Sequence, residues 1–500
     1  MSIRALWHCL LMLLFLHNSV SAIAQEQRLP DKTTEYWEVL LLQGNRVGYN
    51  HTVERAETID GEQRLVTETF GRMELKRAGH SLKMLFQLRF EETPAGALVR
   101  FHSTQTNPPD SKVESAGVRD GDVLRVTMSA GGQQNRREEP DAAGLRSPAF
   151  VDRYLLTNDL PLNELRSFEI FDPQVSQRAT ITLRRIAPAT TKLWADEVNH
   201  LDRVEMTHSA IPGATTTLFL DPKTRRVLKS TTPLLGIDAY RVSQEIATQE
   251  IEPFDQLTAS LIVLQTDKNL AAARSVSYRL TIDGDVPEGM FPSDATQQVT
   301  RDLQQLAIKV TPLTKDQLQP SVTKPESPGQ EYLVATRYIE CTAPLIGKLS
   351  RQACGDADDS VTKAINLERF VRQHIQKRNL ATAMATALEV AQSQAGDCTE
   401  HAVLLTALLR AADIPARVAV GLVHVDSQQA FIGHMWTEAW INGTWFPLDA
   451  TRARGGITCE YIKLLDSPLS GDGAVPDTRL VPLVSVQSRL KVTLEEAVQP

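Results

Sequence analysis

The chain has 500 residues, and at about 100–200 residues per domain this length predicts two to four domains. Its composition, 42% hydrophobic and 23% charged, is that of a folded protein and excludes collagen-like, low-complexity and largely disordered chains. The net charge of −8 offers no excess of positive groups for phosphate contacts. We therefore predict no nucleic-acid partner.

The first 24 residues have the pattern of a secretory signal peptide. Arg4 precedes a short apolar run, and the small residues Ala22 and Ala24 stand before Gln25 as at a cleavage site. The apolar run is shorter than the ~20 residues that a membrane-spanning helix needs. We predict cleavage after Ala24, export to the periplasm or the exterior, loss of Cys9 with the peptide, and no stable membrane span afterwards.

Residues 25–251 are predicted to form a β-rich region. Apolar and polar residues alternate with a period of two at 84–90 and again at 124–128. This alternation is typical of antiparallel sheets with one packed and one solvated face. A charged segment with Gly and Pro at 138–148 either divides the region into two modules or forms a long loop.

The pattern changes after residue 251. We predict a small α+β module at 252–311, with a helix over 295–306. Four prolines then fall within 312–330, which predicts a linker. Residues 331–470 form the predicted C-terminal domain, and 471–500 form a tail.

The C-terminal domain has three predicted helices. Asp359 stands before an apolar stripe, where capping is favoured over a cation site in the surrounding acidic cluster. A second helix is predicted over 381–393. The third follows Cys398, because 402–409 is apolar at helical spacing and Pro415 prevents continuation. Cys398 would thus lie in the first helical turn, where the dipole and the backbone N–H groups favour a thiolate.

A hairpin is predicted around the Asn-Gly pair at 442–443. A two-residue turn there places Trp436 opposite Asp449 and makes His434 the diagonal neighbour of Asp449, about 7–8 Å away at the backbone. Asp449 would hold one imidazole nitrogen of His434 while the other faces the Cys398 thiol. The alternative is an inert domain in which a carboxylate satisfies a buried histidine.

The same register divides the hairpin into two faces. Met435, Ala439 and Phe446 lie on one face, which we expect to be core. The face with His434 and Trp436 is expected to pack against the helix that begins at Cys398.

The motifs around these residues resemble the transglutaminase-like superfamily over roughly 330–470. The resemblance implies a papain-related α+β fold in which Cys398 is the nucleophile, His434 the general base and Asp449 the residue that orients it. It rests on Gly396-Asp397-Cys398, Leu408-Leu409-Arg410, Ile414-Pro415-Ala416-Arg417, His434-Met435-Trp436-Thr437-Glu438 and Trp445-Phe446-Pro447-Leu448-Asp449.

The chain also departs from the animal transglutaminases. These have Gln before and Trp after the nucleophile, where this chain has Asp397 and Thr399, and their calcium sites have no counterpart here. The chain is more similar to the exported prokaryotic branch. Because a carboxylate beside the thiol would oppose thiolate formation, we expect Asp397 to face away or to be paired.

Other polar residues near the motif have two interpretations each. Trp436 either walls a substrate channel or belongs to the core, and Glu438 either lines the site or forms a structural salt bridge. His401 follows Cys398 by three residues, but no further ligand stands at zinc-site spacing. We predict no metal and no cofactor.

Four cysteines remain after removal of the signal peptide. With Cys398 reserved for chemistry, at most one disulfide forms among the others. Cys341 and Cys354 give the simplest pairing, a short loop before the first helix, and Cys459 then stays free.

The sequence thus predicts a multidomain exported enzyme whose substrate is a protein or peptide. Cys398 would form a thioester from a carboxamide, which an amine or water resolves. A cysteine peptidase with the same three residues and a non-catalytic binding or scaffold protein remain open. The substrate, the acceptor, the oligomeric state and the role of the β-rich region are not indicated.

Overall fold

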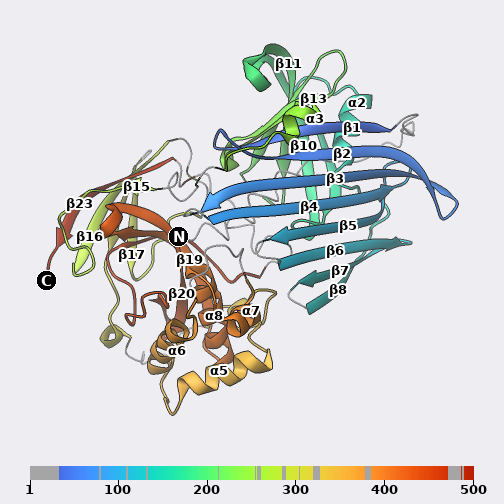
Figure 1. The fold of residues 1–500 in the computed structure, drawn as a ribbon. Helices are drawn as coiled ribbons and strands as arrows, with labels where there is room; N and C mark the ends of the chain where they lie inside the picture. Colours follow the sequence, from blue (N-terminus) through green and yellow to red (C-terminus); the bar gives the residue numbers. More distant parts are fainter. Residues whose placement is uncertain are drawn as a thin grey trace. The chain divides into compact units, whose positions relative to one another are not determined.

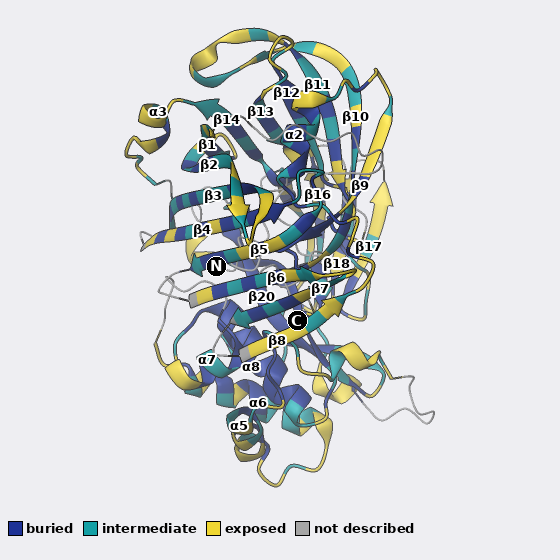
Figure 2. Ribbon diagram, turned by 90° about the vertical axis from the view of Figure 1, so that its right-hand side faces the viewer, coloured by how far each residue is buried: buried dark blue, intermediate teal, exposed yellow. Residues whose placement is uncertain are grey.

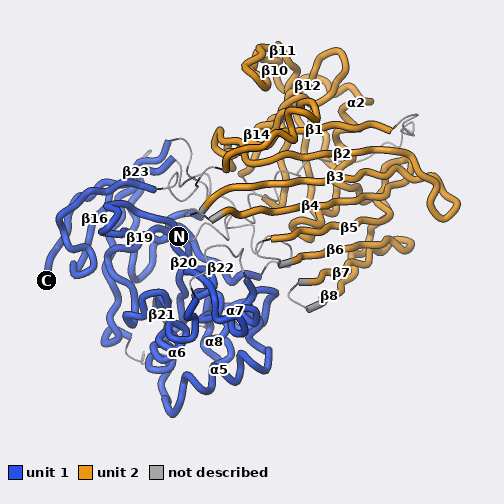
Figure 3. Tube along the Cα trace, viewed as in Figure 1, with its two compact units in different colours: residues 1–8, 256–472, 482–500 blue, residues 9–255, 473–481 orange. Residues whose placement is uncertain are grey.

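The computed structural model describes two compact units, which divide after Asp255 (Figure 3). The predicted signal peptide and Cys9 lie outside the described residues. Described are residues 33–470, except 78–79, 108–110, 131–132, 212, 254, 256–260, 284–285, 287–288, 303–304, 319–326 and 378–384, together with 486 and 489–500.

The N-terminal unit is built on a 14-stranded sheet in which all neighbouring strands are antiparallel, as the alternation at 84–90 predicts. The strand order is β8-β7-β6-β5-β4-β3-β2-β1-β14-β13-β12-β11-β10-β9 (Figure 1). Its elements are β1 (Thr34–Leu42), β2 (Asn45–Ile59), β3 (Glu62–Arg77), β4 (His80–Glu92), β5 (Leu98–Asn107), β6 (Ser111–Asp120), β7 (Val123–Ala130), β8 (Gln133–Glu139), α2 (Phe150–Thr157), β9 (Leu165–Asp172), β10 (Gln177–Lys192), η1 (Trp194–Asp196), β11 (Val198–His208), β12 (Thr215–Leu220), β13 (Val227–Thr232), η2 (Pro233–Leu235), β14 (Ile237–Val242) and α3 (Gln244–Thr248).

The alternation of the sequence produces the core of this unit. Phe90 of β4, Phe101 of β5 and Val126 of β7 are buried in one cluster with Phe171 of β9. The Phe101 and Phe171 rings stack with centroids 5.1 Å apart. Strands from both halves of the sheet therefore share one apolar core, and the segment 138–148 does not separate two modules.

The C-terminal unit has helices packed beside two further sheets. One has the order β15-β20-β19-β22 with β21 on β20, and the other has the order β17-β18-β16-β23. The elements are β15 (Ile262–Val263), β16 (Ser275–Ile282), β17 (Gln297–Asp302), β18 (Gln305–Val310), η3 (Lys315–Gln317), η4 (Gln330–Tyr332), α5 (Pro344–Cys354), α6 (Ser360–His374), α7 (Ala387–Ser393), α8 (Cys398–Ala411), β19 (Ala416–Val425), η5 (Asp426–Gln428), β20 (Ala430–Ile441), β21 (Thr444–Leu448), β22 (Tyr461–Ser467) and β23 (Leu490–Val498).

Three predictions for this unit are wrong. The helix expected over 295–306 is the hairpin β17–β18, in which Leu306, Ile308 and Val310 are buried at a period of two. The last residues of the predicted tail form β23, which pairs with β16. Residues 252–311 are thus no separate α+β module, since their strands share a sheet with the C-terminus.

The helix starts agree with the capping signals. The Asp359 carboxylate accepts a hydrogen bond from the backbone N–H of Thr362 at 2.8 Å and begins α6. Within the predicted linker, 319–326 lie outside the described residues. Among the described helices, none is long and apolar enough to cross a bilayer. The predicted fold class, a β-rich N-terminal region with an α+β C-terminal domain, is confirmed.

Candidate functional site

Cys398 is the first residue of α8, a helix buried along nearly its whole length (Figure 2). Asp397 caps the helix: its Oδ1 accepts from the Thr399 N–H at 3.0 Å, and its own N–H donates to Glu400 Oε2 at 2.9 Å. A Cβ at Gly396 would lie 2.2 Å from the Cβ of Glu400, so this turn requires glycine. The Asp397 carboxylate is thus hydrogen-bonded but not turned away, since its Oδ1 also lies 3.9 Å from Sγ of Cys398, and its charge complements the dipole at the helix start.

The hairpin of β20 and β21 has the predicted register. Trp440 pairs with Trp445 across the turn at 442–443, where both residues have positive φ. Asp449 follows the last residue of β21, and its Oδ2 lies 2.9 Å from Nε2 of His434. The structure therefore brings His434 and Asp449 together.

Both oxygens of the Asp449 carboxylate are hydrogen-bonded. Oδ2 also accepts from the hydroxyl of Tyr461 at 2.5 Å, and Oδ1 accepts from the N–H and the hydroxyl of Thr451 at 2.9 and 2.6 Å. Burial disfavours the ionised form, but the charge of His434 and these bonds outweigh it and hold the pKa of Asp449 well below its usual range.

His434 connects this carboxylate to the thiol. Nε2 bonds Asp449, and a side-chain hydrogen bond joins the imidazole to Cys398, which leaves Nδ1 for the thiol. Burial disfavours the cation, yet the charge of Asp449 and the two hydrogen bonds raise the pKa of His434 to about 9. Cys398, His434 and Asp449 are all buried, so the charges of His434 and Asp449 interact in a water-poor site.

The expected packing of the hairpin against α8 is wrong except at the start of the helix, where His434 meets Cys398. α8 lies against the face of Thr437, whose hydroxyl donates to the Ala402 carbonyl at 3.0 Å. The opposite face, with Trp436, packs against Ile457 and Tyr461. The register shows which residues share a face, but it carries no information about which face a helix covers.

The two remaining candidates on this face have structural partners. Trp436 is 1% exposed and belongs to an apolar cluster. Glu438 is buried and accepts from Arg417 Nε and from Lys463 Nζ, both at 2.8 Å. Lys463 also pairs with Asp294 of the loop before β17. Glu438 is thus the centre of a buried ion-pair network.

Two residues of the site were missed by the sequence analysis. Tyr461 of β22 bonds Asp449, as described above. Glu368 of α6 accepts from the backbone N–H of Asp449 at 2.9 Å and of Gly455 at 2.8 Å. Burial raises the pKa of Glu368 to about 7 although these bonds oppose the shift. Its position beside Leu367 on the apolar stripe of α6 was the available signal.

His401 donates from Nδ1 to the Asp397 carbonyl at 2.5 Å, and burial lowers its pKa. Among the described residues, no group of His, Cys, Asp and Glu side chains could hold a metal ion.

The predicted disulfide is wrong, because Cys341, Cys354, Cys398 and Cys459 are all buried thiols that form no disulfide. Cys341 precedes α5 and Cys354 ends it. An 11-residue helix spans about 16 Å, whereas the Cα atoms of a disulfide lie roughly 4.4–6.8 Å apart.

The C-terminal unit is therefore an α+β domain in which a thiol at a helix start meets an imidazole and a carboxylate from neighbouring strands. Residues 347–450 match the model of the transglutaminase-like superfamily. This match confirms the resemblance of the sequence motifs to that superfamily over this part of the chain.

Solved structures give weaker similarities. A candidate cysteine protease from Cytophaga hutchinsonii is 15% identical with a TM-score of 0.29, covering 48% of this chain and 84% of its own. A β-barrel-like protein from Brucella abortus, of a domain family of unknown function, is 10% identical with a TM-score of 0.30, covering 41% and 93%. A candidate protease from Parabacteroides distasonis is 12% identical with a TM-score of 0.19, covering 71% and 68%. No curated protein sequence matches the chain significantly.

Proposed function

We propose that the chain is an exported acyl-transfer enzyme that forms a thioester at Cys398 from a carboxamide of a protein or peptide. This proposal rests on the two hydrogen bonds of His434, one to the Cys398 thiol and one to the Asp449 carboxylate. An inert buried histidine needs one partner, whereas a general base needs a nucleophile on one nitrogen and an orienting group on the other.

The proposed reaction has two halves. His434 takes the thiol proton, and Sγ attacks the carboxamide carbon while the oxyanion is held by the Cys398 N–H at the start of α8. His434 then gives this proton to the leaving amide nitrogen, so the tetrahedral intermediate expels ammonia and leaves a thioester. An amine or water attacks this thioester and regenerates the thiol. Asp449 keeps its negative charge throughout and stabilises the imidazolium.

The test measures three products from the full chain. Incorporation of a fluorescent cadaverine into casein reports cross-linking, ammonia release reports attack on carboxamides, and new amino termini report peptide hydrolysis. We expect amine incorporation or ammonia release from the wild type. Cys398→Ala should reduce the rate at least about a thousandfold, because the nucleophile is gone.

Cys354→Ala is the matched control, since it removes another buried free thiol and should keep the activity. New amino termini without ammonia would replace the proposal by a cysteine peptidase. A wild type that is inert in all three assays would favour the scaffold protein.

A further inference from the structure

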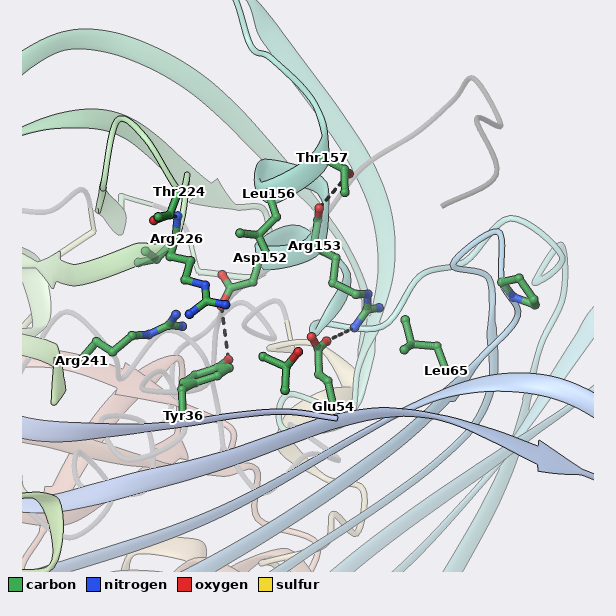
Figure 4. Close-up of a pocket in the computed structure, with 13 residues that line it drawn as sticks. Tyr36, Glu54, Leu65, Asp152, Arg153, Leu156, Thr157, Thr224, Arg226 and Arg241 are labelled. Carbon is green, nitrogen blue, oxygen red and sulfur yellow. Dashed lines mark hydrogen bonds and ion pairs between the residues drawn. The ribbon is translucent and has the colours of Figure 1, made fainter. Parts of the chain in front are cut away.

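The N-terminal unit contains a cavity of about 370 Å³ that no part of the proposed reaction uses (Figure 4). It lies between α2, β1 and the start of β13. Its apolar lining comes from Leu65, Pro94, Leu156 and Val227. This volume is at the lower end of the roughly 300–1,000 Å³ of small-molecule sites and would hold a di- or tripeptide.

One set of charges at the cavity is already neutralised. Arg153 donates to Glu54 Oε1 at 2.5 Å and to Thr67 at 3.0 Å, and it pairs with the buried Glu92. These groups hold α2 on the sheet and are not available to a ligand.

A second set of charged groups at the cavity forms no ion pair among the described residues. The side chains of Asp152, Arg226 and Arg241 point toward one another at the cavity (Figure 4). Among the described residues, no carboxylate forms an ion pair with Arg226 or Arg241, and both Arg241 Nε and Asp152 Oδ1 are buried without a hydrogen-bond partner. Buried polar atoms normally have partners, so these atoms point to an absent ligand.

The aromatic ring of Tyr36 fixes the geometry of this set. The Arg241 guanidinium lies over the ring, 3.9 Å from its centroid, and the hydroxyl donates to Asp152 Oδ2 at 3.3 Å. Tyr36 therefore occupies one oxygen of Asp152 and leaves the other, Oδ1, as the acceptor. Two cations and this partly used carboxylate line the cavity, and Glu38, which faces Arg241 across β1 and β14, is a further carboxylate beside this set.

We propose that this cavity binds the C-terminal end of a peptide whose last side chain is apolar. The terminal carboxylate would lie between Arg226 and Arg241, whose planar groups suit carboxylates. The last backbone N–H would donate to Asp152 Oδ1, and the apolar side chain would contact Leu65 and Val227. A fatty acid matches the cations and the apolar wall but has no donor for Asp152. The inference does not rest on the proposed reaction.

The test is calorimetric titration of the full chain with glycyl-glycyl-leucine. We expect saturable binding, with the C-terminal amide of the same peptide at least about tenfold weaker. Arg241→Gln and Arg226→Ala should each weaken binding about tenfold or more, and the exposed Arg226 keeps the test decisive if Arg241→Gln does not fold. Lys223→Ala, on the same turn outside the cavity, is the control and should bind as the wild type does.

Two results would overturn the proposal. Octanoate binding as tightly as the tripeptide would assign the cavity to fatty acids. No saturable binding of the tripeptide at millimolar concentrations would remove the site altogether.

Discussion

Asp449 differs from an ordinary buried carboxylate in the number of elements that hold it. Its side chain is bound by β20 through His434 and by β22 through Tyr461, and its backbone N–H is bound by α6 through Glu368. An orienting carboxylate must keep both its charge and its position, because a misplaced imidazole loses much of its catalytic effect. We therefore infer that Glu368 is a positioning residue.

This inference gives a prediction for Glu368→Gln. The amide can accept only one of the two backbone N–H groups that the carboxylate binds, so the segment from Asp449 to Gly455 should loosen. We expect kcat to fall about tenfold with KM nearly unchanged, and the free energy of unfolding to fall by about 1–2 kcal/mol.

Glu340→Gln is the matched control, since this buried glutamate also binds a backbone N–H, that of Leu388 at 2.7 Å. It should cost similar stability but leave kcat unchanged. An equal loss of kcat in both variants would show that Glu368 is only structural.

At this scale, part of the site was predictable. Asp449 and His434 are joined by a two-residue turn, so the register alone brings them together. Glu368 and Tyr461 come from other elements, whose approach depends on packing across the domain. No spacing in the sequence encodes that approach.

Among the elements, α2 shows how a short helix is held on a sheet. It has eight residues, too few to be stable alone, and its buried Arg153 pairs with carboxylates of β2 and β4. The ion pairs and the cavity described above both depend on the position of this helix.

We predict that Arg153→Met destabilises the N-terminal unit by about 3–5 kcal/mol, because it leaves Glu92 buried without its cation. Urea unfolding of the full chain measures this loss. The double variant Arg153→Met with Glu92→Gln should recover part of it.

Arg184→Met tests whether the loss of any ion pair would destabilise the protein as much as Arg153→Met does. Arg184 pairs with Glu205 on the surface, where pairs contribute about 0–1 kcal/mol. Equal losses for Arg153→Met and Arg184→Met would contradict the role assigned to α2.

The elements that sequence patterns predicted well are those with local signals. α6 and α8 have carboxylate caps, and the hairpin of β20 and β21 has its Asn-Gly turn. The segment 295–306 has no such signal, and its residues become strands because β18 pairs with β16 as well as with β17. Strand pairing with a distant part of the unit therefore outweighed the local preference of this segment for a helix.

For the molecule as a whole, the His434–Asp449 pair makes stability depend on pH. The pKa of His434 is about 9 in the folded state against an ordinary value of 6.5. A raised pKa of a base contributes stability that is complete below the unfolded value and is lost as pH rises through the folded one. The lowered pKa of Asp449 acts at the acid end, where its contribution is lost as pH falls below the ordinary range.

We therefore predict that the wild type loses up to about 3 kcal/mol of unfolding free energy between pH 6.5 and about 9, more than His434→Gln loses. Urea titrations of both proteins across this range measure the difference. The comparison removes the contributions of other groups that titrate there. Identical pH dependence in the two proteins would contradict the prediction.

The sequence predicted the order of the two units along the chain, but not the pairing between strands that are far apart in the sequence. The sequence places a β-rich region before a transglutaminase-like domain, and the two units have this order. It does not reveal that Leu490 and Val492 of β23 complete the sheet begun by β16, because pairing between distant strands leaves no local pattern.

The pairing of β16 with β23 also has a consequence for biosynthesis. The Thr493 hydroxyl bonds the Arg279 carbonyl 214 positions earlier. A ribosome releases the chain in order, so one edge of β16 waits without its partner until β23 has been synthesised. Most strands of the N-terminal unit pair with a sequence neighbour and can assemble as they emerge. The domain that carries Cys398 therefore completes its fold only after β23 has emerged.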